Sequence, residues 1–239
     1  MSKRMSMMAA GAFAAALLGG TAAMAAPVVN SALVGGVPTS GVTYENFNTL
    51  PLGSGGGALA SGVTVVFTPN AQAVQGAASG VYAPPVLSNG NGTAFGDPNG
   101  IDASTYLAAG STGSTSGAQI EFVFDVAQVY LGLLWGSVDD YNTLAFYDEF
   151  DNLLGTITGT DAVGVSNDNG DQGVDGTFYV NITSDVAFKR VVATSSEFTF
   201  EIDNFAFGTE IPSIPEPASL ALLGLGLLGV GAATRRRKA

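Results

Sequence analysis

Apolar and polar residues alternate along much of the chain between residues 119 and 210, and a period of two is typical of strands with one buried face. Ile120, Phe122 and Phe124 fall on one face of such a strand, whereas Glu121 and Asp125 fall on the other. The segment 131–135 is apolar on both faces, as expected of a central strand. Strands are predicted at 120–126, 130–138, 143–147, 153–158, 177–182, 188–194 and 198–207.

Seven short strands in fewer than 90 residues predict an all-β fold, an antiparallel β-sandwich of jelly-roll type. The preceding part, 26–118, is rich in Gly, Ser and Asn and is predicted to contain few strands, the clearest at 63–67 and a shorter one at 42–44. We expect 26–118 and 119–210 to form one domain. Long loops on a rigid scaffold are where binding surfaces usually lie.

The N-terminus has the layout of a secretory signal peptide. Lys3 and Arg4 precede an apolar stretch, and small residues follow as far as Ala25. We predict a signal peptide at 1–25, cut by signal peptidase between Ala25 and Ala26.

A second uncharged apolar segment, 218–234, follows a Pro-rich linker at 211–217 and precedes a basic tail at 235–239. It is predicted to be one transmembrane helix, and its 16-residue run Ala218–Ala233 would rise about 24 Å, short of a hydrocarbon core of ~30 Å. Basic residues that flank a span stay on the cytoplasmic side, so the main domain is predicted to lie outside.

The order of these C-terminal parts resembles the PEP-CTERM sorting signal of exosortase substrates in Gram-negative bacteria that make exopolysaccharide. The residues that carry the resemblance are Pro215, Glu216, Pro217, Arg235, Arg236 and Arg237. It implies that an exosortase, a membrane-embedded and cysteine-dependent enzyme, recognises the Pro-Glu-Pro triplet and removes or exchanges the tail. The alternative is a plain C-terminal membrane anchor. The segments 131–147 and 202–208 also resemble the β-sandwich ectodomains of PEP-CTERM surface proteins, which implies a fold and no catalytic residue.

Charge and composition exclude several classes of function. Of the 20 acidic residues, 19 lie between positions 26 and 214, where Lys189 and Arg190 are the only basic residues, so this segment has a net charge of −17. Such a surface repels nucleic acid. The chain has no Cys and no His, which removes disulfides, thiolate chemistry and the commonest general base. Any metal would be a hard cation on oxygen ligands, which indicates calcium.

Two groups of polar residues are candidates for such a cation. The first is a loop that contains Asn167, Asp168, Asn169, Asp171 and Asp175. Its spacing does not match an EF-hand, so an irregular calcium loop or a solvated turn are the two interpretations.

The second group lies at predicted strand ends and consists of Asp139, Asp140, Asp203 and Asn204. If the sheet order brings these ends together, the side chains could share a cation or bind sugar hydroxyls. The alternative is that Asp203 and Asn204 cap neighbouring backbone groups.

Aromatic residues and carboxylates define the alternatives for function. Trp135 is expected in the core, whereas Tyr82, Tyr106 and Tyr141 in polar contexts are candidates for carbohydrate contact. A glycosidase needs only two carboxylates, and no local motif singles out such a pair among the glutamates.

We therefore expect a secreted, exosortase-processed protein of the cell surface or extracellular matrix, structural or adhesive and associated with exopolysaccharide. The first alternative is a carbohydrate-binding module with a defined glycan, which could depend on calcium. A glycoside hydrolase comes third, and no enzymatic activity is expected. The membrane is a partner through the C-terminal helix before processing.

Overall fold

A computed structural model describes residues 26–33, 36–110 and 117–213. The predicted signal peptide, with its cleavage site at Ala25, lies outside these ranges, as do the sorting-signal residues and the predicted transmembrane helix. In the described part, no helix is both long enough and apolar enough to span a membrane.

The regular secondary structure of the described residues is almost entirely β-strand. The strands are β1 (Val28–Leu33), β2 (Thr43–Glu45), β3 (Gly57–Ala58), β4 (Val63–Phe67), β5 (Ala71–Val74), β6 (Val86–Leu87), β7 (Gly100–Ile101), β8 (Tyr106–Ala109), β9 (Ala118–Gly136), β10 (Asn142–Tyr147), β11 (Leu153–Thr158), β12 (Phe178–Ser195) and β13 (Phe200–Gly208). Three helical turns join them: η1 (Thr93–Phe95), α1 (Gly159–Val163) and η2 (Val174–Gly176).

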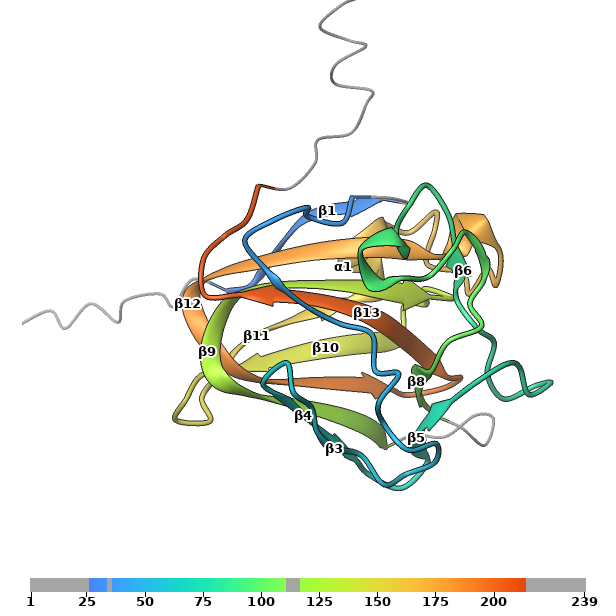
Figure 1. Cartoon of the computed structure of the whole chain (residues 1–239), viewed down its shortest axis with the longest axis horizontal. Coiled ribbons are helices and arrows are strands. Elements are labelled where there is room, and N and C mark those ends of the chain that lie inside the picture. The colour runs from blue at the N-terminus through green and yellow to red at the C-terminus, as the bar shows by residue number, and fades with distance from the viewer. Residues whose placement is uncertain (1–25, 34–35, 111–116, 214–239) are drawn as a thin grey trace, which may run out of the picture.

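Eleven strands form one hydrogen-bonded sheet that folds over into two layers, because β9 and β12 bend in the middle and contribute to both (Figure 1). One layer contains β1, the first half of β12, the second half of β9, then β13, β8 and β5, with β2 beside the end of β13. The other contains β11, β10, the second half of β12, the first half of β9, then β4 and β3. All these pairs are antiparallel, so the predicted all-β antiparallel sandwich is confirmed.

The strand predictions differ from the structure in two ways. Two pairs of predicted strands, 120–126 with 130–138 and 177–182 with 188–194, are the halves of β9 and β12. Polar and exposed residues at the bends made each strand look like two, yet pairing continues across a register shift between Thr183 and Phe188. The part at 26–118 also holds eight short strands, more than predicted, because most have small residues and no alternation of period two.

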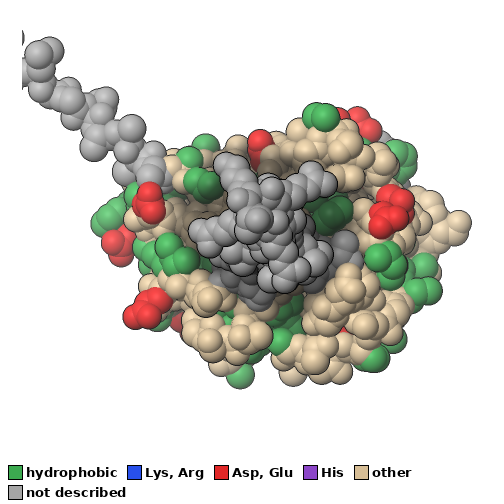
Figure 2. Space-filling view, turned by 90° about the horizontal axis from the view of Figure 1, so that it is seen from above, with side chains coloured by type: hydrophobic (Ala, Val, Ile, Leu, Met, Phe, Trp, Pro, Cys, Tyr) green, Lys and Arg blue, Asp and Glu red, His purple; other side chains and the backbone are tan. Residues whose placement is uncertain are grey.

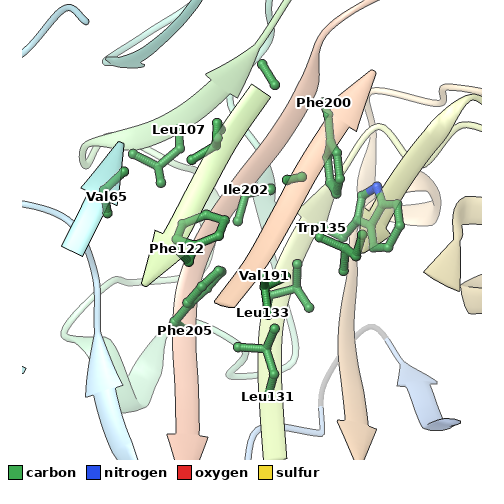
Figure 3. Close-up of a cluster of buried hydrophobic side chains, with 14 of the residues drawn as sticks. Val65, Leu107, Phe122, Leu131, Leu133, Trp135, Val191, Phe200, Ile202 and Phe205 are labelled. Carbon is green, nitrogen blue, oxygen red and sulfur yellow. The ribbon is translucent and has the colours of Figure 1, made fainter. Parts of the chain in front are cut away.

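The core lies between the two layers and is dominated by aromatic rings (Figure 3). Phe122 of β9 meets Phe205 of β13 with ring centroids 4.5 Å apart. Trp135 stacks on Phe200 at 4.4 Å and is fully buried, which confirms the expected core position of this tryptophan. These ring contacts and their burial fix which face of β13 points inward.

The opposite face of this layer is covered by chain from the N-terminal part. A second buried apolar cluster holds that cover in place, and it consists of Val37, Leu87, Phe95, Tyr130, Leu134, Tyr179 and Ala206. In consequence, every residue of β13 is buried, including Glu201 and Asp203 on its outer face. Two carboxyl groups are thus buried under loops, away from the apolar core.

Candidate functional site

A cleft of about 530 Å³ opens where the N-terminal cover meets the start of β13. Its walls come from four segments that are distant in the sequence: 77–83, 137–141, 169–172 and 198–201. The fold brings them together because β9 ends beside the beginning of β13, with Glu201 paired to Gly136.

Aromatic rings line part of the cleft. Tyr82 and Tyr141 are half-buried, and Phe198 is 53% exposed. The rings of Tyr141 and Phe198 lie 6.4 Å apart between centroids. Two of the three predicted tyrosines therefore line one cleft, whereas the third, Tyr106, is fully buried beneath Tyr82 and donates its hydroxyl to the Gly76 carbonyl at 2.5 Å.

Glu201 is the most deeply buried acidic group of the cleft. It is 3% exposed, and one carboxyl oxygen accepts the backbone N–H of Ala83 at 3.0 Å. Burial raises the pKa of Glu201 to about 8, although the Ala83 N–H and the Ser137 hydroxyl oppose that shift. At neutral pH the protonated form therefore dominates, and it can both donate and accept a hydrogen bond.

Asp139 is the second carboxyl group of the cleft. The Tyr141 hydroxyl donates to its Oδ2 at 2.5 Å, and its backbone pairs with Asn169. Burial raises the pKa of Asp139, while the hydrogen bond from Tyr141 offsets part of the shift. The neighbouring Asp140 is exposed and does not line the cleft.

The predicted calcium loop packs against Asp139 and supplies Asn169 to the cleft. Its acidic side chains make local contacts: Asp168 accepts the Thr160 hydroxyl, and Asp171 accepts the Gly173 N–H at 2.6 Å.

The other predicted ligands of that loop, Asn167 and Asp175, contact a neighbouring carbonyl group or solvent. Asn167 donates its amide to the Val163 carbonyl at 3.1 Å, and Asp175 is exposed. Within the described ranges, no group of three or more His, Cys, Asp or Glu side chains is placed to hold a metal ion. Calcium binding by residues 167–175 stays a prediction.

The four residues predicted at strand ends do not share one site. Asp139 lies in the cleft, whereas Asp203 and Asn204 lie further along β13, and the Ser104 hydroxyl donates to Asp203 Oδ2 at 3.2 Å. The charges that act most strongly on Asp203 are those of Asp102 and Asp97 rather than Asp139. The separation arises because β13 runs away from the cleft after Glu201.

Sequence reasoning did not single out Glu201 or the segment 77–83. The alternation of β13 does place 201 and 203 on one face, so the strand pattern carried a signal for the glutamate. The segment 77–83 consists mainly of small residues, as a linker does. Only the folded chain shows that this segment forms a wall of the cleft.

The charged side chains on one face of the molecule are acidic. On the face shown in Figure 2, the charged side chains seen among the described residues are Asp and Glu. Both basic residues of the described part are engaged elsewhere. Arg190 pairs with Glu121 and Asp151, and Lys189 donates to the backbone carbonyl of Asp125. Neither cation lies in the cleft.

Comparisons with solved structures give low similarity. A family 29 carbohydrate-binding module has a TM-score of 0.31 and 13% identity, over 70% of this chain and 86% of that one. The enzymatically active domain of tailspike protein 4 of bacteriophage CBA120 has a TM-score of 0.25 and 14% identity, over 65% of this chain and 20% of that one. These values are too low to relate the cleft to either protein. No curated protein matches the chain.

The family model for the PEP-CTERM protein-sorting motif matches residues 213–238. This range contains the Pro-Glu-Pro triplet, the apolar segment and the basic tail, in the order that the sequence resemblance requires. The chain therefore carries a PEP-CTERM protein-sorting motif at residues 213–238.

Proposed function

We propose that the mature protein is an exosortase-processed component of the cell surface or extracellular matrix, and that its β-sandwich binds extracellular polysaccharide without cleaving it. The sorting motif supports the first part, because it directs the chain to the compartment in which such polysaccharides occur. The second part depends on the cleft between the N-terminal cover and β13.

The observation that carries the proposal is the combination of aromatic rings with uncharged and acidic hydrogen-bonding groups in one cleft. Tyr82, Tyr141 and Phe198 offer ring faces, on which the apolar face of a sugar ring can pack. Asn169 and Glu201 offer donors and acceptors for hydroxyl groups. A concave site with apolar surface and a few polar groups is typical of ligand pockets.

The charged groups of the cleft indicate which kind of polysaccharide it can bind. Asp139 and Glu201 are both buried in the wall, and the cleft contains no Lys or Arg. An anionic sugar would therefore lose its water with no compensating cation, and the net charge of −17 on residues 26–214 would repel it. We infer a neutral polysaccharide as the ligand.

A glycosidase needs one carboxyl that is protonated and another that is ionised. Burial raises the pKa of both Glu201 and Asp139, and no Lys or Arg lines the cleft to hold either carboxyl ionised. We therefore propose binding without hydrolysis, and an assay for released sugar fragments tests this part of the proposal.

The test is calorimetric titration of the purified mature protein with neutral polysaccharides, including the exopolysaccharide of the producing cell. Tyr141→Ala and Phe198→Ala should each weaken binding by about 10-fold, since a lost aromatic contact costs ~1.4 kcal/mol. Tyr141→Phe keeps the ring and removes the hydroxyl, so it separates stacking from the hydrogen bond to Asp139.

Phe150→Ala is the matched control, because Phe150 is 76% exposed on the turn between β10 and β11 and does not line the cleft. It should leave the affinity unchanged. Absence of saturable binding would contradict the proposed ligand, and release of sugar fragments that stops in Glu201→Gln would show an enzyme.

A further inference from the structure

A second polar cluster lies beside the cleft, between β13 and the loop that precedes β8. It consists of Asp102 and Ser104 from the loop and Asp203 and Asn204 from β13, with Asp97 adjacent. Residues about 100 positions apart in the sequence thus meet on the outer face of the layer.

The cluster is deeply buried, and its hydrogen bonds are incomplete. Asp102 is 1% exposed, while Asp203 and Asn204 are fully buried. The Ser104 hydroxyl contacts Asp102 Oδ1 at 2.6 Å and Asp203 Oδ2 at 3.2 Å. Within the described part of the chain, no hydrogen-bond partner meets Asp102 Oδ2, Asp203 Oδ1 or the amide oxygen of Asn204.

A bulge in β13 explains why two successive polar side chains lie here. Asn204 has φ +52°, and the pairing with β9 shifts register between Asp203 and Ala206. Ile202 and Phe205 both pack in the core as a result, although strict alternation would place them on opposite faces. Asp203 and Asn204 are left together on the side of the covering loop, where Asn204 lies next to Asp97.

No basic group of the described chain neutralises these carboxyls, because Lys189 and Arg190 are engaged with other partners. Buried carboxyl groups of this kind must either keep their protons or bind a cation.

We propose that the cluster binds one calcium ion through Asp102 Oδ2, Asp203 Oδ1 and the amide oxygen of Asn204. Calcium accepts amide and carbonyl oxygens beside carboxylates and tolerates irregular geometry, so two carboxylates with an amide form an adequate core of ligands. Asp97 adds a further negative charge at the rim. Asp97 and Ser104 line a cavity of about 320 Å³ through which a hydrated ion can approach.

The ion would join the covering loop to β13. Tyr106 lies close to both Asp102 and Glu201, and it supports Tyr82 of the cleft. Calcium would thus stabilise one wall of the cleft, yet its binding does not require that the cleft binds polysaccharide.

The test is calorimetric and thermal titration of EDTA-treated mature protein with CaCl₂ at neutral pH. Calcium at about 100 times its Kd should raise the thermal midpoint by ~5–10 °C. Asp203→Asn should abolish both the heat of binding and this shift. It should not lower the midpoint in EDTA, because it removes a buried carboxyl that no cation neutralises.

Asp102→Asn is the second variant, to be used if Asp203→Asn fails to fold. It should also lose the calcium response. Asp171→Asn tests the competing loop at 167–175 and should keep the full shift, whereas Asp185→Asn, at an exposed position in the bend of β12, is the matched control. The proposal is overturned if calcium has no effect on the wild type. It is also overturned if the response survives in the folded Asp203→Asn protein, or if Asp171→Asn loses it.

Discussion

Glu201 shows how the burial of one acidic residue makes stability depend on pH. Its folded-state pKa of about 8 lies above the usual 4.5, so the folded protein holds this proton more tightly than the unfolded chain does. The stabilising contribution is complete below pH 4.5 and is lost as the pH rises through 8.

We predict that Glu201→Gln removes this dependence. Because glutamine stays neutral, the free energy of unfolding of the variant relative to wild type should increase by about 3 kcal/mol between pH 5 and pH 8. Denaturant unfolding of both proteins at the two pH values measures the change. Glu149→Gln, on the exposed turn after β10, is the control and should give parallel curves.

The free energies of unfolding of wild type and Glu201→Gln could instead differ by the same amount at pH 5 and at pH 8. Glu201 would then be ionised in the folded protein over this pH range. It would carry a charge in the cleft at neutral pH, and it would act as a hydrogen-bond acceptor only.

Single residues were predictable from the sequence where their role depends on local pattern. Trp135 could be placed in the core because apolar residues surround it in the chain. Tyr106 resembled the other loop tyrosines, yet it is buried, since its neighbours in β5 and β13 come from distant segments. The partition of Asp139 and Asp203 between two sites likewise depends on where β13 runs, which no local pattern encodes.

Among the structural elements, α1 has a positioning role that follows from one glycine. A Cβ on Gly159 would lie 2.0 Å from the Asp139 carbonyl oxygen, so any larger side chain must displace the segment that carries Asp139. This segment is a wall of the cleft.

We predict that Gly159→Ala destabilises the protein by ~1–3 kcal/mol and weakens polysaccharide binding at the same time. Gly55→Ala is the matched control, because its Cβ would make an ordinary contact of 3.6 Å with Pro51. Denaturant unfolding and polysaccharide titration should show lower stability and weaker binding for Gly159→Ala, and neither change for Gly55→Ala. Equal affinities for polysaccharide would show that the segment at 137–141 does not shape the site.

Strand prediction was most successful where one element occupies one layer, as in β4, β10 and β11. It divided β9 and β12, because each strand turns from one layer into the other at a polar stretch that resembles a loop. Apart from β2 and β4, the short strands of the N-terminal part were missed for a different reason. Most of them are stabilised by the strands that they join, so their own residues need no strong β propensity.

For the whole molecule, charge and sorting agree with an extracellular setting. The segment 26–214 has a net charge of −17, which the basic residues at the two ends conceal in the full sequence. Its carboxyl groups suit an environment in which divalent cations are abundant. The absence of Cys means that packing between the layers, supported by any bound cation, must provide the stability.

The central claim is that this acidic β-sandwich is released from both terminal segments and sorted outside the cell. Intact-mass measurement of the protein from envelope and secreted fractions tests it most directly. We predict a mature chain that begins at Ala26 and lacks the Arg235–Lys238 tail. A protein that keeps this tail in both fractions would contradict exosortase processing and indicate a permanent membrane anchor.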